Sequence, residues 1–170
     1  MEEDRQSMIR VDQAGEYGAA RIYAGQLAVL GNRHSASRSI RHMAAQEQRH
    51  LDRFNAMMAE RGVRPTLLQP FWHVAGFALG AVTAAIGPEA AMACTAAIET
   101  EIDQHYGEQL EALGSDDAEL SEAIAEFRSE EVEHKATALA EGAERAPAYP
   151  LLSATIRLGC RMAIQLSKRI

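Results

Sequence analysis

The chain has 170 residues, a formal net charge of −7 and two cysteines. This length suits one domain with a sizeable buried core, and the acidic balance argues against nucleic acid as a partner. Cys94 and Cys160 lie far apart in apolar stretches without a C-x-x-C motif, so both are expected to be reduced thiols. Residues 1–7 are charged, and no export signal is expected there.

The composition favours helices, because Ala, Glu, Leu, Arg and Met are frequent and aromatic residues make up only 5% of the chain. Apolar residues recur at helical spacing, and Gly31, Gly62 and Gly114 stand just past expected helix ends. No linker is long or polar enough to mark a second domain, so residues 1–170 are interpreted as one domain. In chain order, the expected helices span roughly residues 7–30, 33–61, 70–86, 88–113, 117–144 and 151–167.

Two Glu-x-x-His motifs dominate the chain, and each follows a lone glutamate, by 31 residues in the first case and 32 in the second. A Tyr-x-x-Gln-Leu segment also begins seven residues after each lone glutamate, at Tyr23 and at Tyr106. The chain therefore contains an internal repeat with a period of roughly 83 residues. Together the two halves supply Glu16, Glu47, His50, Glu99, Glu131 and His134.

The spacing about the turns brings these residues to one level of the fold. Glu16 lies 15 residues before Gly31 and Glu47 lies 16 after it; Glu99 lies 15 before Gly114 and Glu131 lies 17 after it. With about 1.5 Å of rise per residue, both members of each hairpin lie roughly 23–25 Å from their turn. The stripes on which they lie are otherwise apolar, where an unpaired carboxylate costs several kcal/mol.

Two divalent ions would resolve that cost, because a charge of +4 balances four carboxylates. The i, i+3 spacing lets the Glu and His of one motif reach the same ion. A single Glu-x-x-His pair is usually only a solvated surface pair, but the repeated spacing argues against that interpretation here. This ligand order matches a known pattern, the carboxylate-bridged di-metal site of ferritin-like four-helix bundles. An all-α fold of two antiparallel hairpins is expected, and mixed carboxylate and imidazole ligation suits two iron ions, with manganese as the other option.

Several other polar residues near these motifs have open roles. Glu101 and Glu130 compete with the motif glutamates as ligands, but Glu101 lies off the apolar stripe and Glu130 has no histidine three residues on. Tyr23 and Tyr106 are interpreted either as partners of the ligands or as core. His105 is a candidate for a substrate pocket.

Asp12 and Asp103 each lie one turn from a lone glutamate. Both are candidates for hydrogen bonding to the ligating histidines.

Five segments carry a family resemblance: Asp12-Gln-Ala-Gly-Glu16-Tyr-Gly-Ala, Glu47-x-x-His50, Ala97-Ile-Glu99 leading to His105-Tyr106, Glu130-Glu131-x-Glu133-His134, and Ala146-Pro-Ala-Tyr-Pro150. In this order they resemble the demethoxyubiquinone hydroxylases over nearly the whole chain from Ile9. Gln104 and Lys135 depart from that pattern without removing a ligand.

The resemblance implies a ferritin-like fold and a non-haem di-iron centre that hydroxylates a polyprenyl benzoquinone or quinol ring with O2, late in ubiquinone synthesis. It also implies that the ligands are the six residues of the two halves. An external reductant is needed. NAD(P)H is a candidate, although no Gly-rich dinucleotide motif is present, so it would act without a Rossmann domain or through another protein.

Two segments favour attachment to a membrane surface. Residues 71–86, from Phe71 to Ile86, carry no charge. They are fewer than the ~20 residues that a bilayer crossing needs. This segment is therefore expected to be a crossover helix, a lipid-facing surface or both. No acid follows Glu144, and Arg157 and Arg161 make the 151–167 helix basic and amphipathic, which suits anionic headgroups; a capping helix with a solvated basic side is the alternative.

The expected location is the cytoplasmic face of a bacterial inner membrane, or the matrix side of the mitochondrial inner membrane. A lipid-carrier protein, a ubiquinone-synthesis complex and a second copy of the chain are candidate partners. The main rival function is a ferritin-like protein that oxidises iron without an organic substrate, and a non-catalytic helical scaffold is the other rival. The first predicts no exposed apolar face, and the second leaves the buried carboxylates unexplained.

Overall fold

The computed structural model describes residues 2–169, with side chains from residue 4 onward, and within this part of the chain the secondary structure is entirely helical. This confirms the all-α helical bundle expected from the sequence. The elements are α1 (Glu2–Leu30), α2 (Ala36–Arg61), α3 (Gln69–Ile86), α4 (Pro88–Leu113), α5 (Ala118–Ala140), a short 3-10 helix η1 (Ala143–Arg145) and α6 (Tyr149–Ser167).

Six helix bounds differ from the sequence-based ones by one to five residues: the starts of α1, α2, α3, α5 and α6 and the end of α5. Three of these differences have a clear cause. α1 begins at Glu2 rather than near residue 7. The sequence pattern missed its first turns, because they are polar and lack apolar residues at helical spacing. α5 ends at Ala140 rather than 144, since Gly142 adopts a left-handed conformation with φ +99° and leads into η1. α6 begins at Tyr149, and Pro150 is accommodated in its first turn, where a missing N–H costs nothing.

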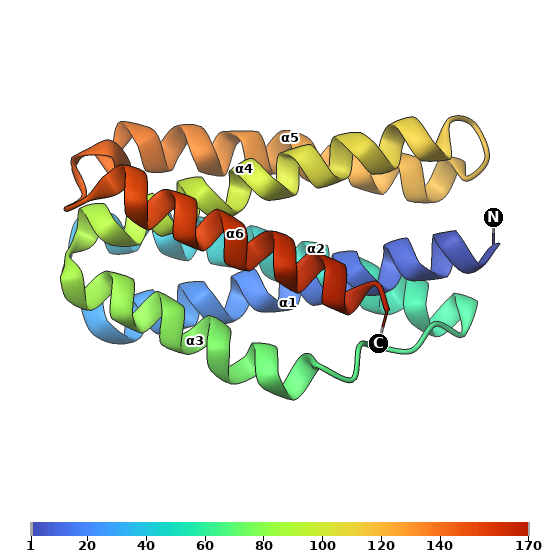
Figure 1. Ribbon diagram of the computed structural model, residues 1–170, viewed down its shortest axis with the longest axis horizontal. Coiled ribbons are helices and arrows are strands. Elements are labelled where there is room, and N and C mark those ends of the chain that lie inside the picture. Colours follow the sequence, from blue (N-terminus) through green and yellow to red (C-terminus); the bar gives the residue numbers. More distant parts are fainter. Residues whose placement is uncertain (1, 170) are drawn as a thin grey trace.

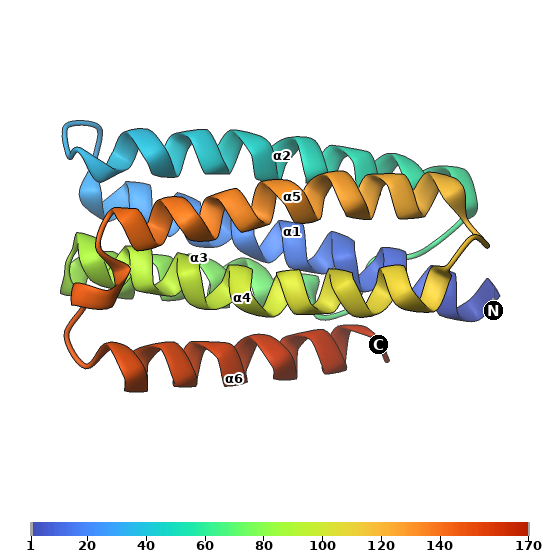
Figure 2. The same ribbon diagram turned by 90° about the horizontal axis from the view of Figure 1, so that it is seen from above.

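Two antiparallel helix pairs form the bundle, α1 with α2 and α4 with α5 (Figure 1). The left-handed glycine at the end of α2, Gly62 with φ +65°, donates its N–H to the Met58 carbonyl and turns the chain into the coil before α3. The coil and α3 together then return along the bundle, so α4 starts at the end where α2 started (Figure 2). The crossover role expected for residues 71–86 is confirmed.

α3 and α6 lie outside this bundle, on the side of α1 and α4 (Figure 2). α3 approaches α1 closely because glycines meet backbone at the crossing: a Cβ on Gly80 would overlap the carbonyl of Ile22, and one on Gly25 would overlap that of Phe77. α6 packs against α4 and, less extensively, against α1. Neither these nor any other described helix combines the length and apolar character needed to cross a bilayer.

The interior of the bundle is mostly apolar, but buried charged side chains gather at one level. Phe54, Ile124 and Phe127 are at most 5% exposed and form part of one continuous hydrophobic cluster. Charged and polar side chains lie among such residues, and they come from all four helices of the bundle. This polar level is the candidate functional site.

Candidate metal centre

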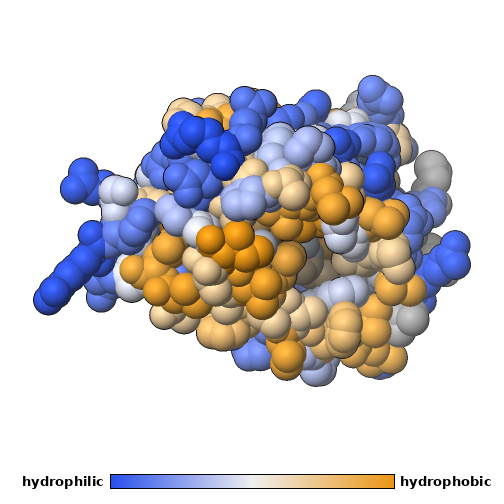
Figure 3. All heavy atoms as spheres, turned by 60° about the vertical axis from the view of Figure 1, so that its left-hand side comes forward, coloured by the Kyte–Doolittle hydropathy of each residue, from blue (hydrophilic) through white to orange (hydrophobic). Residues whose placement is uncertain are grey.

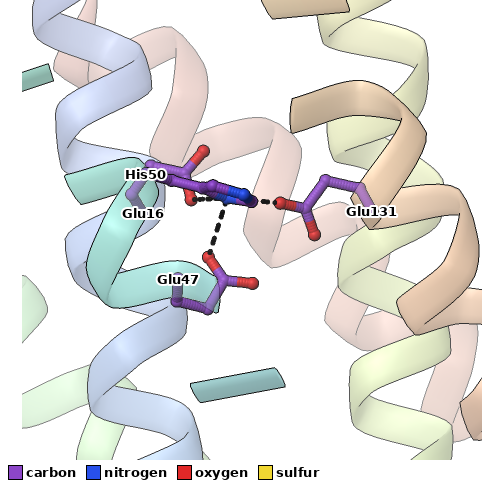
Figure 4. A group of neighbouring side chains, drawn as sticks. All are labelled: Glu16, Glu47, His50 and Glu131. Carbon is purple, nitrogen blue, oxygen red and sulfur yellow. Dashed lines mark hydrogen bonds and ion pairs between the residues drawn. The ribbon is translucent and has the colours of Figure 1, made fainter. Parts of the chain in front are cut away.

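The six motif residues meet between the two helix pairs. All of them are at most 2% exposed, and the structure brings them together at the level expected from the turn spacing. Figure 4 shows four of them, Glu16 from α1, Glu47 and His50 from α2, and Glu131 from α5, pointing toward one another. The complete set is Glu16, Glu47, His50, Glu99, Glu131 and His134.

These residues form two overlapping groups, and in each group the candidate ligand atoms lie within 4.8 Å of one another. The first group, called here the His50 subsite, consists of Glu16, Glu47, His50 and Glu131. The second, the His134 subsite, consists of Glu47, Glu99, Glu131 and His134. Each subsite therefore has one glutamate and one histidine of its own, and the two glutamates of the Glu-x-x-His motifs are shared.

Both imidazoles turn Nδ1 toward the cluster. His50 Nδ1 lies 3.2 Å from Glu16 Oε2 and 3.0 Å from Glu131 Oε1. His134 Nδ1 lies 2.9 Å from Glu131 Oε2 and 3.3 Å from Glu47 Oε1. Glu131 thus reaches the histidines of both halves.

The two tyrosines connect the halves of the repeat. The Tyr23 hydroxyl donates to Glu99 Oε1 at 2.8 Å, and the Tyr106 hydroxyl donates to Glu16. Burial, together with the charge of the partner carboxylate, raises the pKa of both phenols well above its usual value, so both remain donors. Each lone glutamate is therefore oriented by the tyrosine of the opposite half.

The outward nitrogens of the histidines have partners that differ from those expected. Asp12 and Asp103 do not contact them: Asp12 lies beside His105, and Asp103 accepts from Arg128 Nε at 2.7 Å. Glu130 Oε2 lies 2.9 Å from His50 Nε2 instead, and Gln46 Oε1 lies 3.0 Å from His134 Nε2. The prediction was wrong, because both aspartates have other partners and the outward nitrogens are contacted by residues of α5 and α2.

Without cations, the cluster has too few hydrogen-bond donors and too much negative charge. Both carboxylate oxygens of Glu47 and Glu131, Oε2 of Glu99 and Nδ1 of His134 are buried without a well-formed hydrogen bond. Burial and then the charge of Glu131 raise the pKa of Glu47 and of Glu99 well above the usual range. These unpaired oxygen and nitrogen atoms converge on one another. They are suited to binding divalent ions, which would supply the missing positive charge.

The histidines and Glu131 show the same imbalance. Burial opposes charge on His50, but hydrogen bonds from its imidazole to Glu131 and Glu16 raise its pKa to about 10. Burial also opposes ionisation of Glu131, but the adjacent imidazoles of His134 and His50 lower the pKa of this carboxyl to about 2. Protonated His50 thus supplies part of the charge that a metal ion would supply.

An apolar cavity of about 340 Å³ lies beside the His50 subsite, between α1, α3, α4 and α6. Glu16 and Tyr106 belong to its wall, whereas none of the residues that belong only to the His134 subsite does. Most of the remaining lining is small or aliphatic. His105, a candidate for a substrate pocket from the sequence, also lines this cavity.

One polar cluster interrupts the cavity wall. His105 Nε2 lies 3.3 Å from Asp12 Oδ1, which also accepts from Gln109 Nε2 at 2.8 Å. Asp12 Oδ2 and Gln109 Oε1 are buried without a hydrogen-bond partner, and burial raises the pKa of Asp12. Buried polar atoms left unpaired at the wall of an apolar cavity are suited to a ligand with polar groups at one end.

An all-α bundle that buries four carboxylates and two imidazoles beside an apolar cavity belongs to the class of helical-bundle proteins with an internal centre suited to metal ions. Comparison with known proteins makes the assignment more specific. The family model of the ubiquinone biosynthesis protein COQ7 matches residues 3–167, and the chain belongs to this family.

Three relatives illustrate the similarity. The chain is 56% identical over 162 residues to the 3-demethoxyubiquinol 3-hydroxylase of Rhodospirillum rubrum, covering 95% of this chain and 76% of that protein. It is 53% identical over 167 residues to the mitochondrial NADPH-dependent 3-demethoxyubiquinone 3-hydroxylase of Homo sapiens, covering 96% and 76%. It is 41% identical over 179 residues to the mitochondrial 5-demethoxyubiquinone hydroxylase of Saccharomyces cerevisiae, covering 96% and 77%.

Sequence reasoning missed the role of the residues that directly precede the Glu-x-x-His motifs. Gln46 stands before Glu47 and Glu130 stands before Glu131, so these equivalent positions of the repeat were visible in the sequence. Comparing the two halves position by position would have paired them. Glu101, weighed as a competing ligand, is buried away from the cluster and accepts from Arg157 Nε at 2.5 Å.

Proposed function

We propose that this chain is a di-iron monooxygenase that hydroxylates the benzoquinone or quinol ring of a polyprenyl demethoxyubiquinone intermediate with O2. The observation that carries this proposal is the apolar cavity whose wall includes Glu16 and Tyr106. Such a cavity lets an aromatic ring lie beside the cluster while its hydrocarbon tail stays in apolar surroundings. The hydroxylase activities for which the bacterial, human and yeast relatives are named support the same reaction.

The proposed cofactor is a pair of iron ions held by the six clustered residues. Glu47 and Glu131 would be shared between the ions, Glu16 and His50 would hold one, and Glu99 and His134 the other. When bound, ferrous ions supply the electrons and the affinity for O2 that ring hydroxylation requires. The external reductant is proposed to be NAD(P)H, in line with the NADPH-dependent activity named for the human relative.

The protein's own side chains would orient the substrate. We place the oxygen-bearing edge of the ring against Asp12 and His105, because these are buried polar groups of the cavity wall outside the six-residue cluster. A ring hydroxyl can donate to Asp12 Oδ2, which has no partner of its own. Tyr106 holds Glu16 from the cavity side, so that carboxylate keeps its position as the ring enters.

Narrowing the cavity tests this function. Gly18 lines the cavity, and a Cβ added there would meet no other atom within 4 Å, so Gly18→Leu adds bulk to the cavity without disturbing the bundle. Hydroxylation of a demethoxyubiquinol analogue, followed by chromatography, is expected to fall roughly 10- to 100-fold because the ring is displaced. Bound iron should stay unchanged.

Ala136→Leu, on the exposed face of α5, is the matched control and should keep full activity. Full activity of Gly18→Leu would contradict the assignment of the cavity to the substrate. Failure of the unaltered chain to hydroxylate the analogue at all would contradict the proposed function itself.

Attachment to a membrane surface is the second part of the proposal. Figure 3 shows apolar atoms gathered around a hollow on one side of the molecule. Large apolar side chains of α3 and α6 are exposed, and both helices form walls of the cavity, so a tail leaving it can enter lipid directly. The exposed side chains are Phe71, Val74, Val82 and Ile86 on α3 and Leu151, Leu158, Met162 and Leu166 on α6.

The arginines of α6 have a different role from the one expected. Arg157 and Arg161 are directed to the buried Glu101 carboxylate, at 2.5 Å and 3.7 Å. The expectation that they are free for lipid headgroups was therefore incomplete, since an ion pair with α4 already holds them. Reversing their charge would break this contact whether or not lipid binds.

The apolar side chains give a sharper test of membrane attachment. Leu158→Gln with Met162→Gln is expected to weaken flotation with anionic vesicles at least about tenfold, since burying one such side chain contributes ~1.5–3 kcal/mol. Val132→Gln is the control, because Val132 is also exposed, at 47%, but lies on α5. Equal flotation of all variants would contradict attachment through α6.

The remaining proposals concern location and partners. Peripheral attachment is proposed at the cytoplasmic face of a bacterial inner membrane or at the matrix side of the mitochondrial inner membrane. A lipid-carrier protein, a ubiquinone-synthesis complex and a second copy of the chain are the proposed partners, and cross-linking in membranes would test them. The alternative of an iron-handling protein without an organic substrate gains no support from the relatives and leaves the apolar cavity without a use.

A further inference from the structure

His50 and His134 occupy equivalent positions in the two halves of the repeat, but the residues that contact their outward nitrogens differ in charge. The residue directly before each Glu-x-x-His motif contacts the histidine of the opposite half. In the second half this residue is Glu130, which contacts His50. In the first half it is Gln46, which contacts His134. One imidazole is therefore backed by a carboxylate and the other by a neutral amide.

These two partners are joined to each other. Gln46 Nε2 donates to Glu130 Oε2 at 3.0 Å, while Gln46 Oε1 faces His134. The same Glu130 oxygen lies 2.9 Å from His50 Nε2. Because the amide nitrogen is already committed to Glu130, only the amide oxygen is left to accept from His134. The arrangement fixes both rings with Nδ1 inward and an N–H outward.

The rest of the two subsites is closely matched. Each has one lone glutamate that accepts from a tyrosine hydroxyl of the opposite half, and both share Glu47 and Glu131. Arg49 Nη2 also pairs with Glu130, at 3.0 Å, but its side chain is 56% exposed and water screens its charge. The carboxylate behind His50 is thus the main difference between the two histidines.

The two subsites also border different cavities. A second cavity, of about 360 Å³, lies between α2 and α5, and Gln46 and His134 line it together with Arg38, Ser39, His42, Met43, Glu133 and Thr137. None of its lining residues belongs to the His50 subsite. Water and small ions can therefore approach the His134 side from this polar cavity, whereas the His50 side borders the apolar cavity.

We propose that the two subsites are unequal, with the His50 subsite binding its metal ion first and more tightly and the His134 subsite binding second. A carboxylate that accepts the outward N–H makes Nδ1 a stronger donor to a metal, and such outer partners typically change metal affinity about 10- to 100-fold. A neutral amide orients the ring without this gain. The inference rests on the proposed metal centre, but it concerns order and affinity, which hydroxylation itself does not require.

Zinc titration of the metal-free full chain, followed by NMR of the imidazole nitrogens, tests the proposal. Zinc is used because it is diamagnetic and does not react with O2. The His50 resonances are expected to shift during the first equivalent and those of His134 during the second, with dissociation constants about 10- to 100-fold apart. Simultaneous shifts, or His134 shifting first, would overturn the proposal.

Exchanging the two partners gives the decisive variant. Gln46→Glu combined with Glu130→Gln keeps one amide and one carboxylate in contact but places the carboxylate behind His134. The order of the shifts is expected to reverse. Glu130→Gln alone should weaken the first binding step about tenfold or more and bring the two steps together. An unchanged order in the exchanged variant would overturn the proposal.

Glu126→Gln is the matched control, because it removes the same charge from an exposed position of the same helix that lines neither cavity. It should leave both the order and the affinities unchanged, and an equal effect would show that general charge, rather than the contact with His50, sets the order. Absence of any zinc binding would overturn the metal centre and this inference together. Two equal steps in a chain that hydroxylates its substrate normally would overturn the inference alone.

Discussion

Replacing Glu131 by alanine is expected to abolish metal binding and ring hydroxylation while the helical bundle remains folded. Glu131 is the carboxylate nearest to Nδ1 of both histidines, 3.0 Å from that of His50 and 2.9 Å from that of His134. It belongs to both subsites, so its loss removes a ligand from each. Iron content should fall from about two ions per chain to nearly none. Metal analysis and circular dichroism of the same preparation check both parts.

Two further variants sharpen this result. Glu99 belongs only to the His134 subsite, so Glu99→Ala should keep about one ion per chain. Glu126→Ala, five residues before Glu131, exposed and outside both cavities, should keep full metal content and activity. If Glu131→Ala kept its iron and turned over normally, the six-residue centre would be the wrong assignment. Loss of helical content in Glu131→Ala would instead assign the residue a structural role.

The six clustered residues could be identified from the sequence because helical geometry is regular over long distances. Equal separations from Gly31 and Gly114 fix equal depth, and the i, i+3 spacing fixes a common face. The repeat then supplies the pairing of the two halves. These inferences need only the rise and the period of a helix, and the structure places Glu16 and His50 in contact as they require.

The contacts around the cluster could not be obtained in the same way. They depend on which faces of helices from different halves oppose each other, and this is set by packing between the hairpins. Asp12 was expected to hydrogen-bond a ligating histidine, yet it lies beside His105 at the cavity wall, and Glu130 contacts His50 instead. Glu101 was correctly placed off the ligand stripe, but its partner Arg157 lies 56 residues away on α6. The cavity itself exists only because α3 and α6 cover α1 and α4.

The stability of the metal-free protein is expected to fall as pH rises, whereas that of the metal-loaded protein should not. His50 has its pKa raised from 6.5 to about 10 by hydrogen bonds that outweigh its burial. A group whose pKa is higher in the folded state stabilises the fold below its unfolded pKa, and this contribution is lost as pH rises through the folded pKa. For His50 the loss therefore extends from about pH 6.5 to about pH 10.

The glutamates extend this trend to lower pH. Burial raises the pKa of Glu47 and of Glu99, so their contributions decline as pH rises above about 4.5. Glu131 has the opposite sign: its pKa is lowered to about 2, so its contribution is present above pH 4.5 and is lost only in strong acid. Above pH 6.5, Glu131 therefore does not offset the loss of stability that comes from His50.

Calorimetry of the full chain at pH 6.5 and pH 9, with a chelator or with manganese(II), measures this difference. Each unit by which a pKa is moved corresponds to ~1.4 kcal/mol, so the metal-free chain should lose a few kcal/mol and melt several degrees lower at pH 9. Bound ions replace the protons, so stabilisation by metal should increase with pH. Glu47→Gln with Glu99→Gln should flatten the metal-free pH profile, since neither amide titrates. A metal-free melting temperature that rises from pH 6.5 to pH 9 would show that the carboxylates do not share a desolvated site, and the charge argument for a metal pair would fail with it.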